Sequence, residues 1–416
     1  MDVLSRFLSY AAVDTQSSEN PAARDGVSSP QPSTEKQWKL ARKLMQELKE
    51  LGAEVQLSEY GYVYAKIRGN ADAPKVGFIS HMDTSPSASG ENVRPRIVRN
   101  YDGGEIPLGN GKTLSPSVFP ELLRRVGEDL VVTDGTTLLG ADDKAGVAEI
   151  MTMAEHFLTH PEEAHGELRI AFTPDEEVGR GTEHFDLGRF GADFAFTVDG
   201  DELGKIEYEN FNAASGTVRI QGVNVHPGSA KGRMVNAALM AMEFNRLLPD
   251  CIPANTEKYE GFFHLTKISG DESMCEMHYI IRDHDRAEFE KKKRIFLDAA
   301  EQLNRKFEGT DAHADAEVKD SYYNMKEKIL PEHRRILDLA SEAMRRSGIT
   351  PFTEPIRGGT DGAMLSWRGL PCPNLPTGGG NYHGVYEYVS IHAMRTMVQV
   401  LENIVRLNVR RSRENP

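Results

Sequence analysis

Cysteine is scarce in this chain of 416 residues. The three cysteines (Cys251, Cys275 and Cys372) form no CxxC motif, which excludes a disulfide scaffold and indicates a reducing compartment, the cytoplasm. Long hydrophobic runs are also missing, since runs such as 168–173 are far shorter than the ~20 residues that a membrane-spanning helix needs. The N-terminal stretch has an early Asp2 and no long apolar segment, so we expect no secretory signal.

Positive charge is in deficit. Lys and Arg number 49 against 63 for Asp and Glu, which gives a formal net charge of −14. A surface this acidic repels phosphates, so nucleic acid and anionic membranes are not expected partners. With 39% hydrophobic and 27% charged residues, the composition is typical of a soluble globular enzyme. At ~100–200 residues per domain, the length predicts two or three domains.

Strand and helix patterns alternate in the first half of the chain. Apolar runs fall at 76–80, 129–132, 168–173 and 193–198, and helical patterns at 34–51 and 145–158. This alternation predicts an α/β fold with a mixed, largely parallel sheet flanked by helices. In the first helical pattern Thr34 and Gln37 have capping-box spacing, and Gly52 follows as a stop signal. The segment 15–33, rich in Ser, Pro, Asn and Asp, is predicted to be a surface loop.

The pattern changes near residue 210. Strands are expected at 214–221, 261–269, 274–282 and near 313–320, and helices at 234–247 and 286–307. Their order, β-α-β-β-α-β, is that of a ferredoxin-like module. Helical patterns at 332–346 and 390–409 then resume the earlier style. We therefore predict a domain formed by 1–209 and 322–416, interrupted by an inserted α+β domain at 210–321.

Acidic residues and one histidine follow the predicted strands. His81 and Asp83, Glu176 and Glu177, and Asp199 come after three of them, and Asp142 and Asp143 precede a predicted helix. Because the carboxyl ends of parallel strands share one sheet edge, these groups would form a cluster too anionic to exist without cations. Imidazole and carboxylates without cysteine suit zinc or a similar divalent ion in an open, catalytic site. Taken singly, each acidic pair also fits a solvated loop or a helix cap, and His81 fits a buried core histidine.

The spacing within the cluster indicates a division of roles. Asp83 lies two positions after His81 and would fix its tautomer from the same side of an extended chain. Glu176 and Glu177 are adjacent, so one can bind metal while the other takes a proton from a metal-bound water. One carboxylate shared between two ions could bridge them at ~3.5–4 Å.

Three segments carry a family resemblance. Residues 77–85 (GFISHMDTS), 138–146 (LLGADDKAG) and 172–179 (FTPDEEVG) resemble the co-catalytic zinc metallopeptidases of family M20, and within it the tripeptide aminopeptidases. The resemblance continues through 197–200, 210–214, 224–228, 279–283, 356–362 and 381–384, in order and over nearly the whole chain. It implies a zinc-exopeptidase-like fold and an enzyme that releases the N-terminal residue of tripeptides.

The resemblance also implies the metal ligands. His81 and Asp199 would hold one zinc ion, and Glu177 and His383 the other. Asp142 would bridge both ions, and its neighbour Asp143 would have no ligand role.

Further roles follow from the same resemblance. Glu176 would be the general base that activates the bridging water, and Asp83 would orient His81. His226, in the inserted domain, would stabilise the oxyanion, and Arg282 and Arg357 would bind the terminal carboxylate of the peptide. The alternative for His226 is a residue of a plain His-Pro-Gly turn, and for each arginine a structural ion pair. The inserted domain is expected to close over the short substrate and is a candidate surface for homo-oligomer formation.

Other functions are compatible with parts of this sequence pattern. An acyl-amino-acid deacylase or a dipeptidase would share the fold and the metal site. A nucleotide-binding loop at 109–113 (GNGKT) lacks the required first glycine, since Ile106 stands there. A non-catalytic metal-binding module would lack the general base, whereas Glu176 is present. Cys372 fits a buried structural thiol better than a nucleophile, because the sequence places no base for it.

Overall fold

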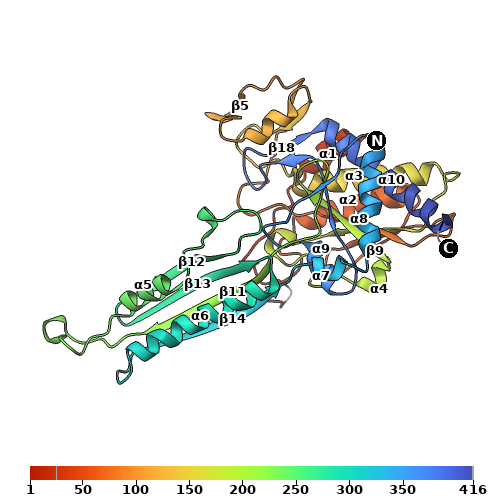
Figure 1. Cartoon of the computed structure of the whole chain (residues 1–416). Coiled ribbons are helices and arrows are strands. Elements are labelled where there is room, and N and C mark those ends of the chain that lie inside the picture. The colour runs from red at the N-terminus through yellow and green to blue at the C-terminus, as the bar shows by residue number, and fades with distance from the viewer. Residues whose placement is uncertain (25, 415–416) are drawn as a thin grey trace. The chain divides into compact units, whose positions relative to one another are not determined.

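The computed structural model describes residues 1–24 and 26–414 and contains two compact units (Figure 1). The first comprises Met1–Tyr208, Glu327–Glu354 and the chain from Thr360 onward. The second comprises Glu209–Lys326 and the short segment Pro355–Gly359.

A six-stranded sheet forms the centre of the first unit, in the order β1-β2-β8-β3-β9-β16. Its strands are β1 (Glu54–Leu57), β2 (Val63–Ile67), β8 (Leu168–Thr173), β3 (Val76–His81), β9 (Phe194–Gly200) and β16 (Asn374–Pro376). The four strands from β8 to β16 are parallel, whereas β1 and β2 pair antiparallel at one side. The predicted mixed, largely parallel sheet is confirmed.

Alternating residues of the strands face two different layers. Phe78 of β3 lies in the larger core, and its neighbour Ile79 lies in a smaller core on the other face. The larger core is closed by α1 (Val3–Ala11), α2 (Gln37–Glu50), α3 (Ala141–Thr159), α8 (Arg334–Arg346) and α10 (Ile391–Glu414). The smaller core is closed by α4 (Leu187–Phe190) and α9 (Asp361–Trp367), with the short α7 (Lys326–Ile329) preceding α8. This two-sided burial explains why the central strands read as continuous apolar runs.

One predicted strand belongs to a different sheet. The run at 129–132 forms β7 (Leu130–Val132), which pairs antiparallel in the order β17-β18-β7-β4. The partners are β4 (Arg96–Val98), β17 (Gly379–Gly380) and β18 (Tyr388–Ser390). These residues bury a separate small core around Tyr101 and Tyr388. Placing the run among the strands of the main sheet was therefore wrong, because an apolar run indicates burial but not the core in which the strand is buried.

The nucleotide-binding alternative does not fit the local structure. Residues 109–113 lie at the turn between β5 (Ile106–Gly109) and β6 (Lys112–Leu114), an antiparallel hairpin. A phosphate-binding loop needs a strand followed by a helix. A further short parallel pair joins β10 (Lys205–Ile206) to β15 (Phe352–Thr353).

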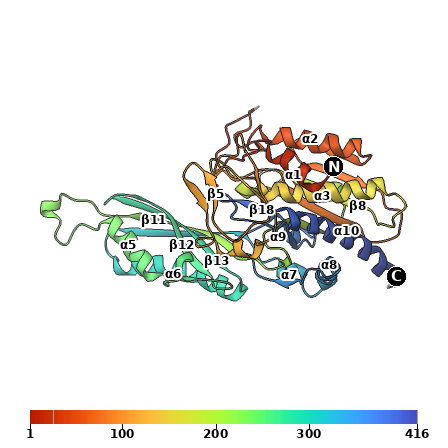
Figure 2. The ribbon, with the colours of Figure 1, turned by 90° about the horizontal axis from the view of Figure 1, so that it is seen from above.

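The second unit has the predicted ferredoxin-like order. Its elements are β11 (Asn212–Gln221), α5 (Ala237–Leu247), β12 (Phe262–Gly270), β13 (Met274–Asp283), α6 (Arg286–Lys306) and β14 (His313–Tyr322). The sheet order is β12-β13-β11-β14 with every pair antiparallel. Figure 2 shows α5 and α6 on the same face of this sheet, where their apolar side chains form the core of the unit.

Of two local expectations near the N-terminus, the capping box was wrong and the surface loop is confirmed only in part. Thr34 and Gln37 form no capping box; the Thr34 hydroxyl donates to the carbonyl of Gln16, and Gln37 points to a buried carboxylate described below. The segment 15–33 is exposed in its middle but buried at several positions toward its ends, namely Thr15, Ser17, Gln31 and Ser33. None of the helices in the described part of the chain combines the length and apolarity that a membrane crossing requires.

Candidate active site

Three neighbouring strands bring the predicted site residues of the first unit together. β8, β3 and β9 are adjacent and parallel, so their carboxyl ends meet at one edge. β3 ends at His81, β9 carries Asp199 near its end, and Glu176 and Glu177 lie in a short 3-10 turn just after β8. Asp142 enters the same place at the start of α3.

The five predicted ligands form one continuous cluster. His81 Nε2 lies 2.8 Å from Asp142 Oδ1 and 3.4 Å from Asp199 Oδ1. His383 Nε2 lies 3.0 Å from Asp142 Oδ2 and 2.9 Å from Glu177 Oε2. Asp142 therefore turns one oxygen to each histidine and links the two halves of the cluster.

These donor atoms fit a pair of zinc-type sites. Four ligands at ~2.0–2.1 Å from a tetrahedral ion lie about 3.3 Å from one another, close to the separations seen here. Donor groups that could hold a metal occur around His81 on both sides, with Asp142 and Glu177 in one and Asp199 in the other. Glu177 Oε1 is buried without a hydrogen-bond partner, as expected of an oxygen whose natural partner is a cation.

Asp143, which was predicted to have no ligand role, lies within the cluster. One of its carboxylate oxygens accepts from the Ser80 hydroxyl and, at 3.1 Å, from the backbone N–H of His81. The other oxygen is buried without a partner, and Asp143 belongs to the donor group of His81 and Asp199. The Asp143 side chain thus holds the end of β3 by its bonds to Ser80 and to the backbone of His81.

Asp83 does more than the sequence indicated. Its backbone carbonyl lies 3.1 Å from His81 Nδ1, and its carboxylate lies 3.4 Å from the same nitrogen. The carboxylate also accepts from the backbone N–H groups of Glu176 at 3.0 Å and Glu177 at 3.2 Å. Asp83 is fully buried, so this one side chain connects the histidine to the turn that carries both glutamates.

The pKa values of the cluster show how strongly it favours positive charge. Burial raises the pKa of Asp199 to about 6 and, together with the Asp142 charge, raises that of Glu177 to about 7. Hydrogen bonds to Asp142 and Glu177 raise the pKa of His383 to about 11. Burial opposes protonation of His81, but the Asp199 charge and hydrogen bonds to acidic neighbours outweigh it and raise its pKa well above 6.5. In the metal-free chain, bound protons offset the negative charge of the cluster, and divalent cations would offset it more effectively.

Glu387 is a site residue that the sequence analysis missed. Its buried carboxylate accepts from the backbone N–H groups of Leu139 (2.6 Å), Gly140 (2.8 Å) and Asp142 (3.0 Å). Burial is the main reason that its pKa rises to about 7. Glu387 holds the segment leading to Asp142, and no spacing rule marked it, because its partners are backbone groups far away in the sequence.

Asp361 was also missed, although it lies inside the quoted stretch 356–362. It begins α9, accepts from the Thr173 hydroxyl at 2.8 Å, and has its pKa raised to about 7 by burial. A Cβ at Gly181 would lie only 2.2 Å from its carboxylate, so only glycine fits there. Asp361 thus fixes the end of β8 and the loop that follows Glu177.

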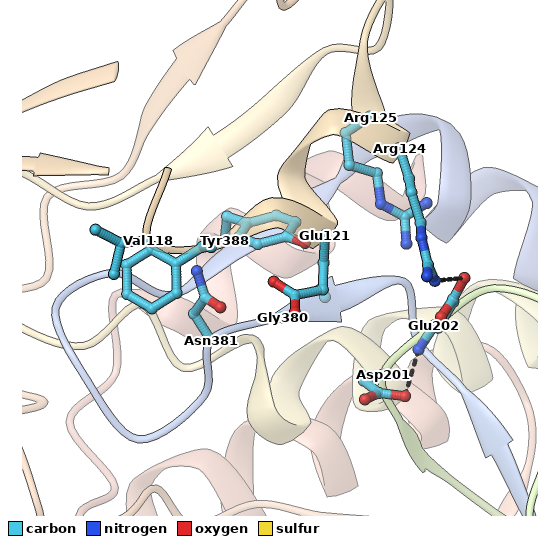
Figure 3. Close-up of a pocket in the computed structure, with 11 residues that line it drawn as sticks. Val118, Glu121, Arg124, Arg125, Asp201, Glu202, Gly380, Asn381 and Tyr388 are labelled. Atoms are coloured by element: carbon cyan, nitrogen blue, oxygen red, sulfur yellow. Dashed lines mark hydrogen bonds and ion pairs between the residues drawn. The ribbon is translucent and has the colours of Figure 1, made fainter. Parts of the chain in front are cut away.

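A cavity of about 320 Å³ is lined in part by residues that are close in sequence to the cluster residues (Figure 3). Asp201, two residues after Asp199, lines it from one side, and Gly380 and Asn381, just before His383, line it from another. Arg124 and Arg125 point toward it from the 3-10 helix η1 (Pro120–Arg125). Arg124 pairs with Glu202, and Asp201 pairs with Lys205 at 2.6 Å, so most lining charges are balanced. The lining of the cavity is therefore rich in paired charges.

His226 and Arg282 belong to the second unit. His226 is exposed at the start of η3 (Pro227–Ser229), and its Nδ1 accepts from the backbone N–H of Gly228 at 3.1 Å. Arg282, on β13, stacks its guanidinium 4.8 Å from the ring centre of Tyr322. No hydrogen bond of the Arg282 guanidinium is found among the described residues, which leaves its donors available.

Arg357 is already engaged within the second unit. Its guanidinium donates to the backbone carbonyls of Lys258 (2.8 Å) and Glu260 (3.0 Å) and to the Thr256 hydroxyl (3.0 Å). It also stacks 5.1 Å from the ring centre of Phe211. These contacts favour the structural alternative for Arg357 over a direct hold on substrate.

The raised carboxyl pKa values predict that the metal-free protein becomes less stable as pH rises. Folding raises the pKa of Glu177 and Glu387 from 4.5 to about 7, so their contribution to stability is full below pH 4.5 and is lost as pH rises to about 7. The high pKa of His383 acts in the same direction. At ~1.4 kcal/mol per pKa unit, we expect the Tm of chelator-treated protein to fall by several degrees between pH 5 and pH 8. Zinc-loaded protein is the control, and its Tm should fall less over the same pH range. A Tm of the chelator-treated protein that stays constant or rises from pH 5 to pH 8 would contradict the assignment of these groups to a metal site.

Comparisons with known sequences give consistent matches. Residues 133–407 match the model of peptidase family M20/M25/M40. The chain is 54% identical to peptidase T of Clostridium perfringens strain 13, over 97% of this chain and 98% of the relative. It is 52% identical to peptidase T of Salmonella paratyphi A, over 98% of this chain and 99% of the relative.

Solved structures share the fold. An aminopeptidase from Bacillus cereus matches with a TM-score of 0.77 at 21% identity, covering 98% of both chains. A tripeptidase from Staphylococcus aureus matches with a TM-score of 0.77 at 20% identity and the same coverage. A dinuclear metal-binding M20 peptidase from Bacillus subtilis matches with a TM-score of 0.67 at 14% identity.

Proposed function

This chain belongs to peptidase family M20/M25/M40 and to the peptidase T group within it, and from that premise we propose that it is a tripeptide aminopeptidase. It hydrolyses the first peptide bond of a tripeptide and releases the N-terminal residue. The observation that carries the proposal is the Asp142 carboxylate, which gives one oxygen to His81 and the other to His383.

We propose two zinc ions per chain as the cofactor. His81 and Asp199 would hold one ion, Glu177 and His383 would hold the other, and Asp142 would be shared by both. The support is the donor separations of 2.8–3.4 Å and the nitrogen and oxygen donor set without sulfur. When bound, such ions lower the pKa of a shared water and polarise the scissile carbonyl.

Glu176 is the general base in this proposal. It accepts the proton of the attacking water and passes it to the leaving amine. Burial, and then the nearby charges of Asp199, Asp361 and Glu177, raise its pKa above 4.5 in the metal-free chain, which favours a group able to hold a proton. Asp83 sets the position of Glu176 by accepting from its backbone N–H.

The second unit supplies the remaining substrate contacts in this proposal. We assign catalysis to the first unit, close to the predicted 1–209 and 322–416. The role of an inserted lid or dimerisation domain goes to the second unit, which extends the predicted 210–321 to Glu209–Lys326 and adds Pro355–Gly359. His226 stabilises the oxyanion, supported by its exposed ring, and Arg282 binds the terminal carboxylate, supported by its available donors. Arg357 keeps a substrate role only through the loop at 256–260 that it holds. Three unpaired cysteines support a cytoplasmic location.

A small peptide panel tests the substrate. The purified zinc-loaded protein is incubated with a dipeptide, a tripeptide, a tetrapeptide and an N-acetylated tripeptide, and products are read by mass spectrometry. We expect the free tripeptide to lose its first residue about 100-fold faster than the others, because a site built to pair both charged ends leaves buried groups unpaired with a wrong ligand. Preference for the acetylated or two-residue substrate would overturn the proposal in favour of a deacylase or dipeptidase. No cleavage of any peptide would favour a non-catalytic metal-binding module.

A further inference from the structure

Asp175 lies directly before the two glutamates and has an unusual conformation. It is fully buried, and its φ of +59° is in the left-handed region, which costs free energy for a residue with a side chain. Such a conformation persists only where surrounding groups hold it. The groups that hold Asp175 come from the N-terminal segment, which the proposed function does not use.

Ser33 and Gln37 enclose the Asp175 carboxylate. Its Oδ1 accepts from the Ser33 hydroxyl at 2.5 Å and from Gln37 Nε2 at 2.6 Å, and its Oδ2 accepts from the Ser33 backbone N–H at 2.7 Å. Gln37 Oε1 in turn accepts from the Asp175 backbone N–H at 3.2 Å. Ser33 and Gln37 are themselves almost fully buried, so water cannot replace these bonds if they are lost.

The segment that carries Ser33 is anchored on both sides of the active site. Toward its start, Ser17 N–H donates to the Thr84 carbonyl at 3.1 Å, next to Asp83. Toward its end, Gln31 Nε2 donates to the Arg180 carbonyl at 2.8 Å, and Arg180 N–H donates to the Asp175 carbonyl at 2.9 Å. The segment therefore connects the loop after β3 to the loop after β8.

We propose that Ser33, Gln37 and Asp175 form a brace that positions Glu176 and Glu177. The three are positioning residues, since they act through the turn that carries Glu176 and Glu177. Asp83 holds the backbone N–H groups of the two glutamates, and the brace fixes the turn from the residue before them. The carboxylates of Asp83 and Asp175 together determine the direction of the Glu176 and Glu177 side chains. This inference rests on the proposed roles of Glu176 as base and Glu177 as ligand.

Weakening the brace should displace both Glu176 and Glu177. Removal of one donor leaves a buried carboxylate oxygen short of a bond, and the turn relaxes toward other donors. A displacement of ~1 Å at a reacting group costs about 100-fold in rate. Loss of a contact that orients a metal ligand typically costs about 10–100-fold in metal affinity or activity.

The test uses Ser33→Ala and Gln37→Met, which keep Asp175 itself, because a change of Asp175 risks misfolding. Zinc affinity is measured by competition with a chromophoric chelator, and kcat, KM and Tm are measured alongside. We expect kcat to fall about 10–100-fold with KM within about twofold, and the weaker zinc site to lose about tenfold in affinity.

Ser17→Ala is the matched control. Ser17 lies in the same segment, is similarly buried, and donates its hydroxyl to the Thr84 carbonyl at 3.2 Å, a carbonyl that also keeps the Ser17 N–H bond. If Ser33→Ala and Gln37→Met lower kcat and zinc affinity no more than Ser17→Ala does, the brace is wrong. If the wild-type protein cleaves no peptide, the proposed function fails, while the zinc-affinity difference still tests the brace.

Discussion

Glu176→Gln is expected to lower kcat by up to about 10⁴-fold, the upper range for a positioned general base. The amide has the shape of the carboxylate but cannot accept the proton of the attacking water. Glu176 takes part in neither of the contacts that link His383 to Asp142 and Glu177, so the variant should keep two zinc ions and a KM close to that of the wild type. Steady-state kinetics on a tripeptide, with metal content measured on the same sample, would check both points.

The control for this variant is Glu162→Gln, the same change at an exposed turn residue. It should leave kcat unchanged. A loss below about tenfold in Glu176→Gln would remove Glu176 from the role of base, since general base catalysis contributes at least ~100-fold. Loss of zinc in this variant would instead point to Glu176 as a ligand.

Asp142→Asn is expected to weaken both zinc sites at once. Its two oxygens face His81 at 2.8 Å and His383 at 3.0 Å, and an amide offers one neutral oxygen in place of two charged ones. We expect a loss in zinc affinity greater than the ~10–100-fold typical of an outer contact, with activity falling to background. Chelator competition and zinc analysis after dialysis would measure it.

Asp143→Asn provides the comparison within the same segment. Its carboxylate accepts from Ser80 and from the His81 backbone, and an amide oxygen can still accept these bonds. We expect Asp143→Asn to retain two zinc ions with reduced stability. Equal zinc loss in the two variants would make Asp143 a ligand and contradict the assignment of Asp142 as the single bridge.

The sequence predicted those site residues that follow a regular strand. His81, Glu177 and Asp199 each come at or just after the end of a buried parallel strand, so the sheet edge that they share could be read from apolar runs alone. His383 follows no such run and was assigned from the family resemblance. The α/β and ferredoxin-like parts were predictable for the same reason, since each has a clear periodicity.

The supporting residues could not be found in this way. Glu387 binds three backbone N–H groups, and Asp175 is bound by side chains 138 and 142 positions away. Backbone donors have no residue identity, and pairings at this separation depend on tertiary packing rather than local pattern. Gln37 shows the conflict directly, because its spacing from Thr34 fits a helix cap while its buried position serves Asp175.

The long separation between Asp142 and its partners has a consequence for synthesis on the ribosome. Asp142 meets His383 across 241 positions, and its backbone is held by Glu387 across 245. A nascent chain that ends before these residues has made β3, β8 and β9 but lacks one histidine and the carboxylate under Asp142. The proposed two-metal centre is therefore complete only after these late residues have been synthesised, and we expect an unfinished chain to lack peptidase activity.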